Sequence, residues 1–258
     1  MSLRVGDRKL ETLEVVRHDD IVVLTLDRPD SLNALDEVAF EEVPETLARI
    51  REDDSVRVLV LTGRGRGFCA GADVKEVLPQ RAAPQRSATI PEPAGREWTI
   101  GLPDLQVPVV AAVNGPAAGA GFGIALMCDI RIAAESAFFV EAHVARGLTP
   151  SIAAWYLPRI VGLTMAMDLL LRERRVYAKE ALEMGLVSQV VPDNELMDAT
   201  MSVARELAAK PPFALRTAKA AVNQALDAPL LAIRQFAGAM EALSKLALTE
   251  ARDGYENF

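Results

Sequence analysis

The chain has 258 residues, half of them hydrophobic, and a formal net charge of −8. This length provides ample core for one large domain, and the negative charge argues against a broad nucleic-acid surface. Two cysteines, Cys69 and Cys128, are too few to stabilise a chain of this length by disulfide bonds, so we expect a reduced, cytoplasmic setting. We also expect neither a signal peptide nor a membrane span, because no apolar segment of suitable length occurs.

The N-terminal part of the chain alternates strand and helix signals. Two short apolar runs, Leu13–Arg17 and Ile21–Leu26, predict a β-hairpin. Asp36–Ile50 follows as a helix, with Asp36 as the N-cap and one apolar face. Pro44 lies inside this helix and should kink or split it.

Three strongly apolar runs predict buried strands: Val56–Thr62, Val107–Val113 and Ile130–Ala133. Apolar strands separated by helices are typical of a buried sheet with helices outside, which makes this an α/β protein. Between the first two strands, Pro79–Gly95 has no periodicity and predicts a loop.

The second half of the chain is predominantly helical. We expect a core over residues 1–190 and a helical region over 191–258 that covers the core or packs on another subunit. The expected helices are Ile152–Val161, Thr164–Leu171, Ala178–Met184, Glu195–Ala209, Phe213–Leu226 and Pro229–Leu246, with a short strand at Leu186–Val191.

Two glycine-rich turns, Gly63–Asp73 and Asn114–Gly123, each follow a predicted buried strand. Small residues at a strand-to-helix turn let the backbone approach a ligand, and the first N–H groups of a helix lack intrahelical partners. If the N–H groups of Ala72 and Ala120 converge, they form an oxyanion hole that stabilises a thioester carbonyl as it gains enolate character. The alternative is that these glycines only permit close packing.

Nucleotide-binding motifs do not explain these turns. Gly119–Gly123 does not match G-x-G-x-x-G, and no Gly-Lys-Ser/Thr sequence forms a P-loop.

Motifs spread over nearly the whole chain are Arg28-Pro29, Leu32–Leu35, Phe68–Lys75, Pro108–Gly115, Gly119–Gly121, Met127–Asp129 and Ala178–Val187. As a set they resemble the crotonases, the enoyl-CoA hydratase/isomerase superfamily. The resemblance implies a crotonase-like spiral of ββα repeats, a C-terminal helical region used in homotrimers or dimers of trimers, and acyl-CoA thioester substrates. It also implies no separate cofactor and no metal, since coenzyme A arrives as part of the substrate.

The resemblance assigns roles to particular residues. It places the oxyanion hole at the N–H groups of Ala72 and Ala120. It places six residues along the CoA nucleotide and pantetheine: Arg28, Leu32, Ala34, Ala70, Asp73 and Lys75.

The sequence departs from the family pattern at both glutamates that hydratases use on one water molecule. Gly123 and His143 occupy these positions, and isomerases of the family often keep the second glutamate, which is also absent. Glu141 is the nearest acid and would face the same side as His143 on an extended segment. His143 could act as a single base alpha to a thioester, or it could merely fill the space of the lost carboxylate.

Three functions therefore stay open. The first is an enzyme of fatty-acid metabolism that isomerises, decarboxylates or cleaves an acyl-CoA with one base, because two-glutamate hydration is not supported. The second is a non-catalytic acyl-CoA-binding protein, and the third is a structural subunit. Cys69, beside the first turn, is expected to pack rather than to act as a nucleophile.

Overall fold

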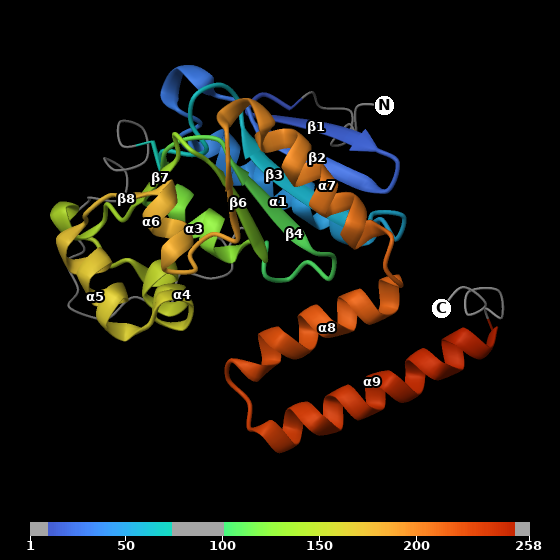
Figure 1. Cartoon of the computed structure of the whole chain (residues 1–258). Helices are drawn as coiled ribbons and strands as arrows, with labels where there is room; N and C mark the ends of the chain where they lie inside the picture. The colour runs from blue at the N-terminus through green and yellow to red at the C-terminus, as the bar shows by residue number, and fades with distance from the viewer. Residues whose placement is uncertain (1–9, 74–100, 251–258) are drawn as a thin grey trace, which may run out of the picture.

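The computed structural model describes residues 10–73 and 101–250, with side chains as far as residue 243. A six-stranded sheet with the order β1-β2-β3-β4-β6-β9 forms its centre (Figure 1). β1 and β2 are antiparallel, and the remaining neighbours pair in parallel, which confirms the hairpin and the three buried strands. The strands are β1 Leu13–His18, β2 Ile21–Leu26, β3 Val58–Gly63, β4 Val109–Val113, β6 Ile130–Ala134 and β9 Gln189–Val191.

The inner strands β2, β3 and β4 are buried on both faces of the sheet. In β3, Val58 and Val60 belong to one apolar cluster, whereas Leu59 and Leu61 belong to the other, as the two-residue period of a strand requires. Helix α7 (Leu196–Ala208) covers the face of Val58 and lies across the sheet in Figure 1. Helices α1 (Glu37–Glu52) and α3 (Ala120–Met127) pack with the opposite cluster. Because these inner strands are buried on both faces, their sequences are nearly continuous apolar runs.

Helix α1 begins where the sequence predicts. The Ala39 N–H donates to the Asp36 carboxylate at 2.8 Å, so Asp36 is the N-cap. The helix runs on through Pro44, so the predicted split is wrong. Val43 and Leu47, before and after Pro44, are both buried, and this shared packing holds the two halves together despite the lost hydrogen bond.

A second sheet, with the order β5-β7-β8, has no counterpart among the sequence predictions of strands. Its strands are β5 (Ala117–Ala118), β7 (Phe138–Val140) and β8 (Val176–Tyr177), too short for an alternating pattern to appear. β5 pairs in parallel with β7 and also forms a bridge to Cys69. This short strand therefore joins the first glycine turn to the segment that leads into Glu141.

The remaining helices agree closely with the predictions. They are α4 Ser151–Val161, α5 Leu163–Arg172, α6 Ala178–Glu183, α8 Pro212–Ala225 and α9 Leu230–Glu250. Among the helices in the described ranges, none combines the length and apolar content that a bilayer span requires. The predicted loop Pro79–Gly95 lies outside the described residues.

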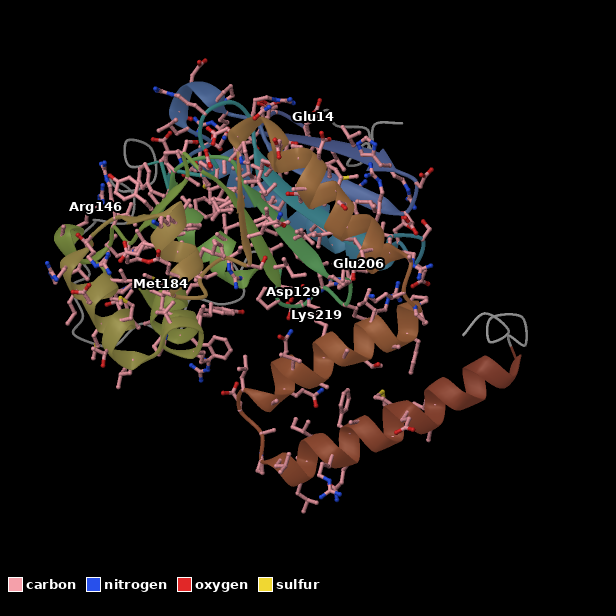
Figure 2. All side chains as sticks on the ribbon, viewed as in Figure 1. Glu14, Asp129, Arg146, Met184, Glu206 and Lys219 are labelled. Carbon is pink, nitrogen blue, oxygen red and sulfur yellow. The ribbon has the colours of Figure 1, made fainter. Side chains whose placement is uncertain are left out.

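The C-terminal helices divide into two groups. α7 packs on the central sheet, whereas α8 and α9 form a hairpin that stands away from it (Figure 1). Lys219 of α8 points back toward Asp129, as Figure 2 shows, and its Nζ lies 2.7 Å from that carboxylate and 2.9 Å from the Val107 carbonyl. The α8–α9 hairpin is thus anchored to the core by a polar contact. The predicted boundary between a core over residues 1–190 and a helical region over 191–258 stays a prediction.

Candidate active site

The two glycine turns lie against each other. The Ala118 N–H donates to the Cys69 carbonyl at 2.9 Å, and the Phe68 and Cys69 N–H groups both donate to the Pro116 carbonyl at 3.1 Å. Gly71 has a φ of +93°, and a Cβ built on it would lie 3.2 Å from the Ala120 nitrogen. The backbone beside Ala72 therefore reaches the start of α3, as the convergence hypothesis requires.

Neither of the two predicted oxyanion donors is used by the protein within the described residues. Ala120 is the first residue of α3, so its N–H has no intrahelical acceptor. Around Ala72, the Leu35 N–H donates to the Gly71 carbonyl and the Asp73 N–H donates to the Leu35 carbonyl. Because these alternate peptide groups face Leu35, the Ala72 N–H points to the other side. Both N–H groups remain available to a bound oxygen.

Close packing also explains one of the glycines. A Cβ on Gly121 would lie only 2.0 Å from the Cys69 carbonyl oxygen, so no other residue fits there. Cys69 is fully buried, and burial raises the pKa of its thiol to about 12. A protonated, inaccessible thiol is not a nucleophile, which supports the expected packing role.

The second sheet brings His143 and Glu141 to these turns. The Gly119 N–H donates to the Val140 carbonyl at 2.9 Å, at the end of β7. The predicted extended segment is wrong after this point: His143 has helical angles, φ −100° and ψ −42°, because a 3-10 turn begins there. The two side chains meet nevertheless, with His143 Nδ1 hydrogen-bonded to Glu141 Oε1.

The imidazole of His143 lies beside Gly119, the residue before the predicted donor Ala120. Its Cε1 is 3.8 Å from the point that a Cβ on Gly119 would occupy, and Gly119 directly precedes Ala120. The His143 side chain is 24% exposed, whereas Glu141 is 1% exposed. The site therefore offers an accessible ring backed by a buried carboxylate.

At Gly123, an apolar side chain occupies the adjacent space. A Cβ there would lie 3.4–3.6 Å from three atoms of Ile152, in the first turn of α4. The longer side chain of a glutamate would need the room that Ile152 takes. Position 123 itself therefore offers no side chain for proton transfer, and Ile152 packs beside it.

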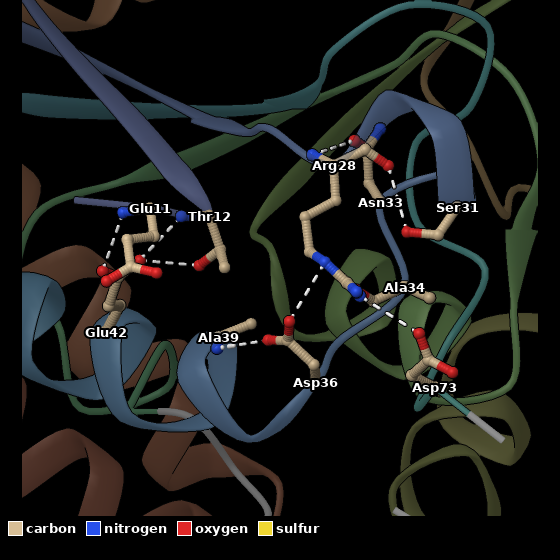
Figure 3. Close-up of polar contacts among 10 residues, drawn as sticks. All are labelled: Glu11, Thr12, Arg28, Ser31, Asn33, Ala34, Asp36, Ala39, Glu42 and Asp73. Carbon is tan, nitrogen blue, oxygen red and sulfur yellow. Dashed lines mark hydrogen bonds and ion pairs between the residues drawn. The ribbon is translucent and has the colours of Figure 1, made fainter. Parts of the chain in front are cut away.

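Among the predicted CoA-binding residues, Arg28 connects two others, Ala34 and Asp73 (Figure 3). Its guanidinium contacts the Asp36 carboxylate at 3.1 Å and the Asp73 carboxylate at 3.2 Å, and it donates to the Ala34 carbonyl at 2.6 Å. Two more of the six predicted residues contact each other, because the Ala70 N–H donates to the Leu32 carbonyl at 2.9 Å. Lys75, the sixth, lies outside the described residues.

Two asparagines that the sequence analysis did not single out hold the first turn in shape. Asn33, with a φ of +57°, donates through Nδ2 to the Gly67 carbonyl at 2.7 Å and the Arg64 carbonyl at 3.0 Å. Asn114 donates to the Gly63 and Gly65 carbonyls, both at 2.8 Å. Asn114 begins the second glycine-rich motif, and asparagine commonly satisfies turn carbonyls, so it could have been singled out. Asn33 lies far from both motifs in the sequence, so only the structure shows its contact with the first turn.

Metal ligation is not apparent at the site. In the described part of the chain, no group of three or more His, Cys, Asp or Glu side chains could hold a metal ion.

Comparison with known proteins agrees with the fold and the motifs. The family model for enoyl-CoA hydratase/isomerase matches residues 17–258, and the chain belongs to this family. It is 42% identical over 208 residues to the 1,2-epoxyphenylacetyl-CoA isomerase of Escherichia coli K12, covering 80% of this chain and 79% of that protein.

Two further relatives cover most of the chain. The short-chain-enoyl-CoA hydratase of Clostridium acetobutylicum is 35% identical over 221 residues, which is 85% of this chain and 84% of that protein. The crystal structure of a monofunctional enoyl-CoA isomerase from M. smegmatis superimposes with a TM-score of 0.74 at 34% identity, over 87% of this chain and 98% of that one.

Proposed function

We propose that this protein is an enzyme that moves the double bond of an enoyl-CoA thioester. The Ala72 and Ala120 N–H groups form the oxyanion hole, and His143 is the single base. One observation carries the proposal: the imidazole lies against Gly119, next to two backbone N–H groups with no acceptor among the described residues, while Ile152 occupies the space beside Gly123.

The reaction needs one base that first accepts and then returns a proton. His143 removes a proton from C2 of a 3-enoyl thioester, and the electron pair of that C–H bond moves toward the carbonyl oxygen. The N–H groups of Ala72 and Ala120 stabilise the resulting enolate. The protonated imidazole then delivers the same proton to C4, which leaves the double bond between C2 and C3.

Hydration is disfavoured by the same geometry. Adding water to the double bond needs one group to activate the water and another to supply a proton, and hydratases of the family use two carboxylates for this purpose. Ile152 occupies the space where one of them would extend. The isomerase names of two relatives, from E. coli and M. smegmatis, are consistent with a single-base reaction.

Binding of the CoA moiety is part of this proposal. The nucleotide and pantetheine would run along the first turn, at Arg28, Leu32, Ala34, Ala70, Asp73 and Lys75. The contacts of Arg28 with two carboxylates support a role in holding this surface together.

A homotrimer, or a dimer of trimers, is the proposed assembly, formed by the helical region 191–258. The α8–α9 hairpin stands away from the core and exposes large apolar side chains, which an adjacent subunit would cover: Val222, Leu230 and Leu231 are each at least 65% exposed. A reduced cytoplasmic setting fits the two buried, unpaired cysteines.

A spectrophotometric assay tests the reaction. Purified protein with cis-3-hexenoyl-CoA should increase the ultraviolet absorbance as the double bond becomes conjugated with the thioester, whereas crotonyl-CoA should keep its absorbance. His143→Ala should lower kcat by about 10²-fold or more, the usual contribution of a general base. Calorimetric affinity for hexanoyl-CoA should change only a few-fold.

The other histidine provides a matched control, because His18 is exposed at the end of β1 and His18→Ala should keep full turnover. Hydration of crotonyl-CoA by the wild type would contradict the proposed reaction. Tight acyl-CoA binding without turnover would instead identify a binding protein. If the protein binds no acyl-CoA, the structural-subunit hypothesis would remain.

A further inference from the structure

We infer that Glu141 is a positioning residue that holds the proton of His143 on Nδ1 and leaves Nε2 free to take the substrate proton. This inference rests on the proposed function and names a second residue, Glu141, that assists the proposed base His143. It goes beyond His143 alone because Glu141 contacts the ring at Nδ1 and acts only through the imidazole.

The donor and acceptor chemistry of the pair carries the argument. An ionised carboxylate accepts hydrogen bonds and donates none. A neutral imidazole bonded to it through Nδ1 must therefore place its single proton on Nδ1. The lone pair is then on Nε2, the ring nitrogen that Glu141 does not contact.

Burial makes the contact selective. Glu141 is 1% exposed, and among the described residues its carboxylate also accepts the Ala142 N–H, at 3.2 Å. A buried carboxylate is costly unless it is paired and hydrogen-bonded, so the loss of the imidazole contact would be strongly unfavourable. Glu141 therefore prevents a flip of the imidazole ring that would exchange the positions of its two nitrogens.

Other charged groups near this segment are engaged with the backbone. Arg146 donates to the Ala142 carbonyl, and Glu173 accepts from the Ala145 N–H at 3.1 Å. Glu141 is consequently the charged group in contact with the His143 ring among the described residues. When His143 accepts a proton at Nε2, the new positive charge lies next to this carboxylate, which stabilises it.

The chain offers an unusually direct spectroscopic test because it contains only two histidines, His18 and His143. In the His18→Gln variant, ¹⁵N-labelled histidine reports on His143 alone. At alkaline pH, once the ring is neutral, we expect the ¹⁵N spectrum to show a protonated Nδ1 and an unprotonated Nε2. A proton on Nε2 would overturn the inference, and this measurement requires neither substrate nor a mutation at the site.

Kinetics of Glu141→Gln test the consequence. The amide is nearly isosteric and can present its NH₂ group to Nδ1, which moves the ring proton to Nε2. We expect kcat to fall by about 10²-fold with KM within a few-fold, a loss within the range of general-base catalysis. Glu141→Asp should retain the Nδ1 proton and part of the rate. Full turnover by Glu141→Gln would overturn the inference.

The two experiments separate this inference from the proposed function. If the spectrum shows the Nδ1 proton and Glu141→Gln shifts it, the positioning role stands even if no enoyl-CoA is isomerised. If isomerisation depends on His143 but not on Glu141, the proposed function stands and the positioning role is refuted.

Discussion

Gly121→Ala is the substitution whose effect the structure defines most sharply. Gly121 is the second residue of α3, and a Cβ there would lie 2.0 Å from the Cys69 carbonyl oxygen and 2.7 Å from the Cys69 Cβ. Contacts of a Cβ below 3.0 Å are essentially never seen, so the atoms must separate by at least 3.0 − 2.0 = 1.0 Å. Since the nearest obstacle is backbone, the two glycine turns themselves must move apart.

This movement acts directly on the proposed oxyanion hole, because Cys69 precedes Ala72 by three residues and Gly121 follows Ala120. A misplacement of about 1 Å costs roughly 10²-fold in rate. Forcing a methyl group into a packed interior costs about 1–3 kcal/mol in the free energy of unfolding. We therefore expect both a slower enzyme and a less stable one, with the rate loss larger than any loss of folded protein explains.

Initial rates with cis-3-hexenoyl-CoA and thermal unfolding of the same preparation measure the two effects. Gly238→Ala in α9 is the matched control, because a Cβ at Gly238 meets nothing within 4 Å. This control should keep full turnover and gain about 1 kcal/mol from helix propensity. A Gly121→Ala variant with wild-type turnover and melting temperature would refute the close contact of the turns, and with it the position of the hole.

Four further predictions test separate contacts. Ala120→Pro removes one donor at the first position of α3, where proline is tolerated, so initial rates should fall about 10²–10³-fold with little change in melting temperature. Gly123→Glu with His143→Glu should yield measurable hydration of crotonyl-CoA only when Ile152→Ala makes room for the first carboxylate. Glu42→Ala leaves the Thr12 N–H and hydroxyl without the acceptor they reach at 2.9 and 2.7 Å, and urea denaturation should show a loss of about 3 kcal/mol. Cys69 and Cys128, whose pKa values burial raises to about 12, stay protonated at pH 8, so a thiol reagent should label neither before unfolding.

Each of these has a clear contrary result. Full turnover by Ala120→Pro would place the oxyanion donor elsewhere. Hydration without the Ile152 change would mean that this side chain does not limit the site. An unchanged unfolding free energy for Glu42→Ala, or rapid labelling of a thiol in the folded protein, would contradict the burial of those groups.

The main elements of the fold were predictable because their signals are local. The hairpin, the buried strands and the helices each depend on a run of neighbouring residues, and the N-cap Asp36 lies next to the helix that it begins. Pro44 misled the prediction for the same reason: its effect was judged from the helix alone, whereas Val43 and Leu47 stabilise that helix through packing on distant residues.

The sequence by itself determined the α/β class, the two glycine turns, the family and the absence of a carboxylate at positions 123 and 143. Only the tertiary structure decided how the site is assembled. β5 has two residues, yet it bonds to Cys69 on one side and to β7 on the other, which brings His143 to Ala120 from 23 positions away in the chain. The Glu141–His143 contact arises at a 3-10 turn, and Ile152 reaches Gly123 from another helix. Such contacts depend on the path of the whole chain, so no periodicity in the sequence predicts them.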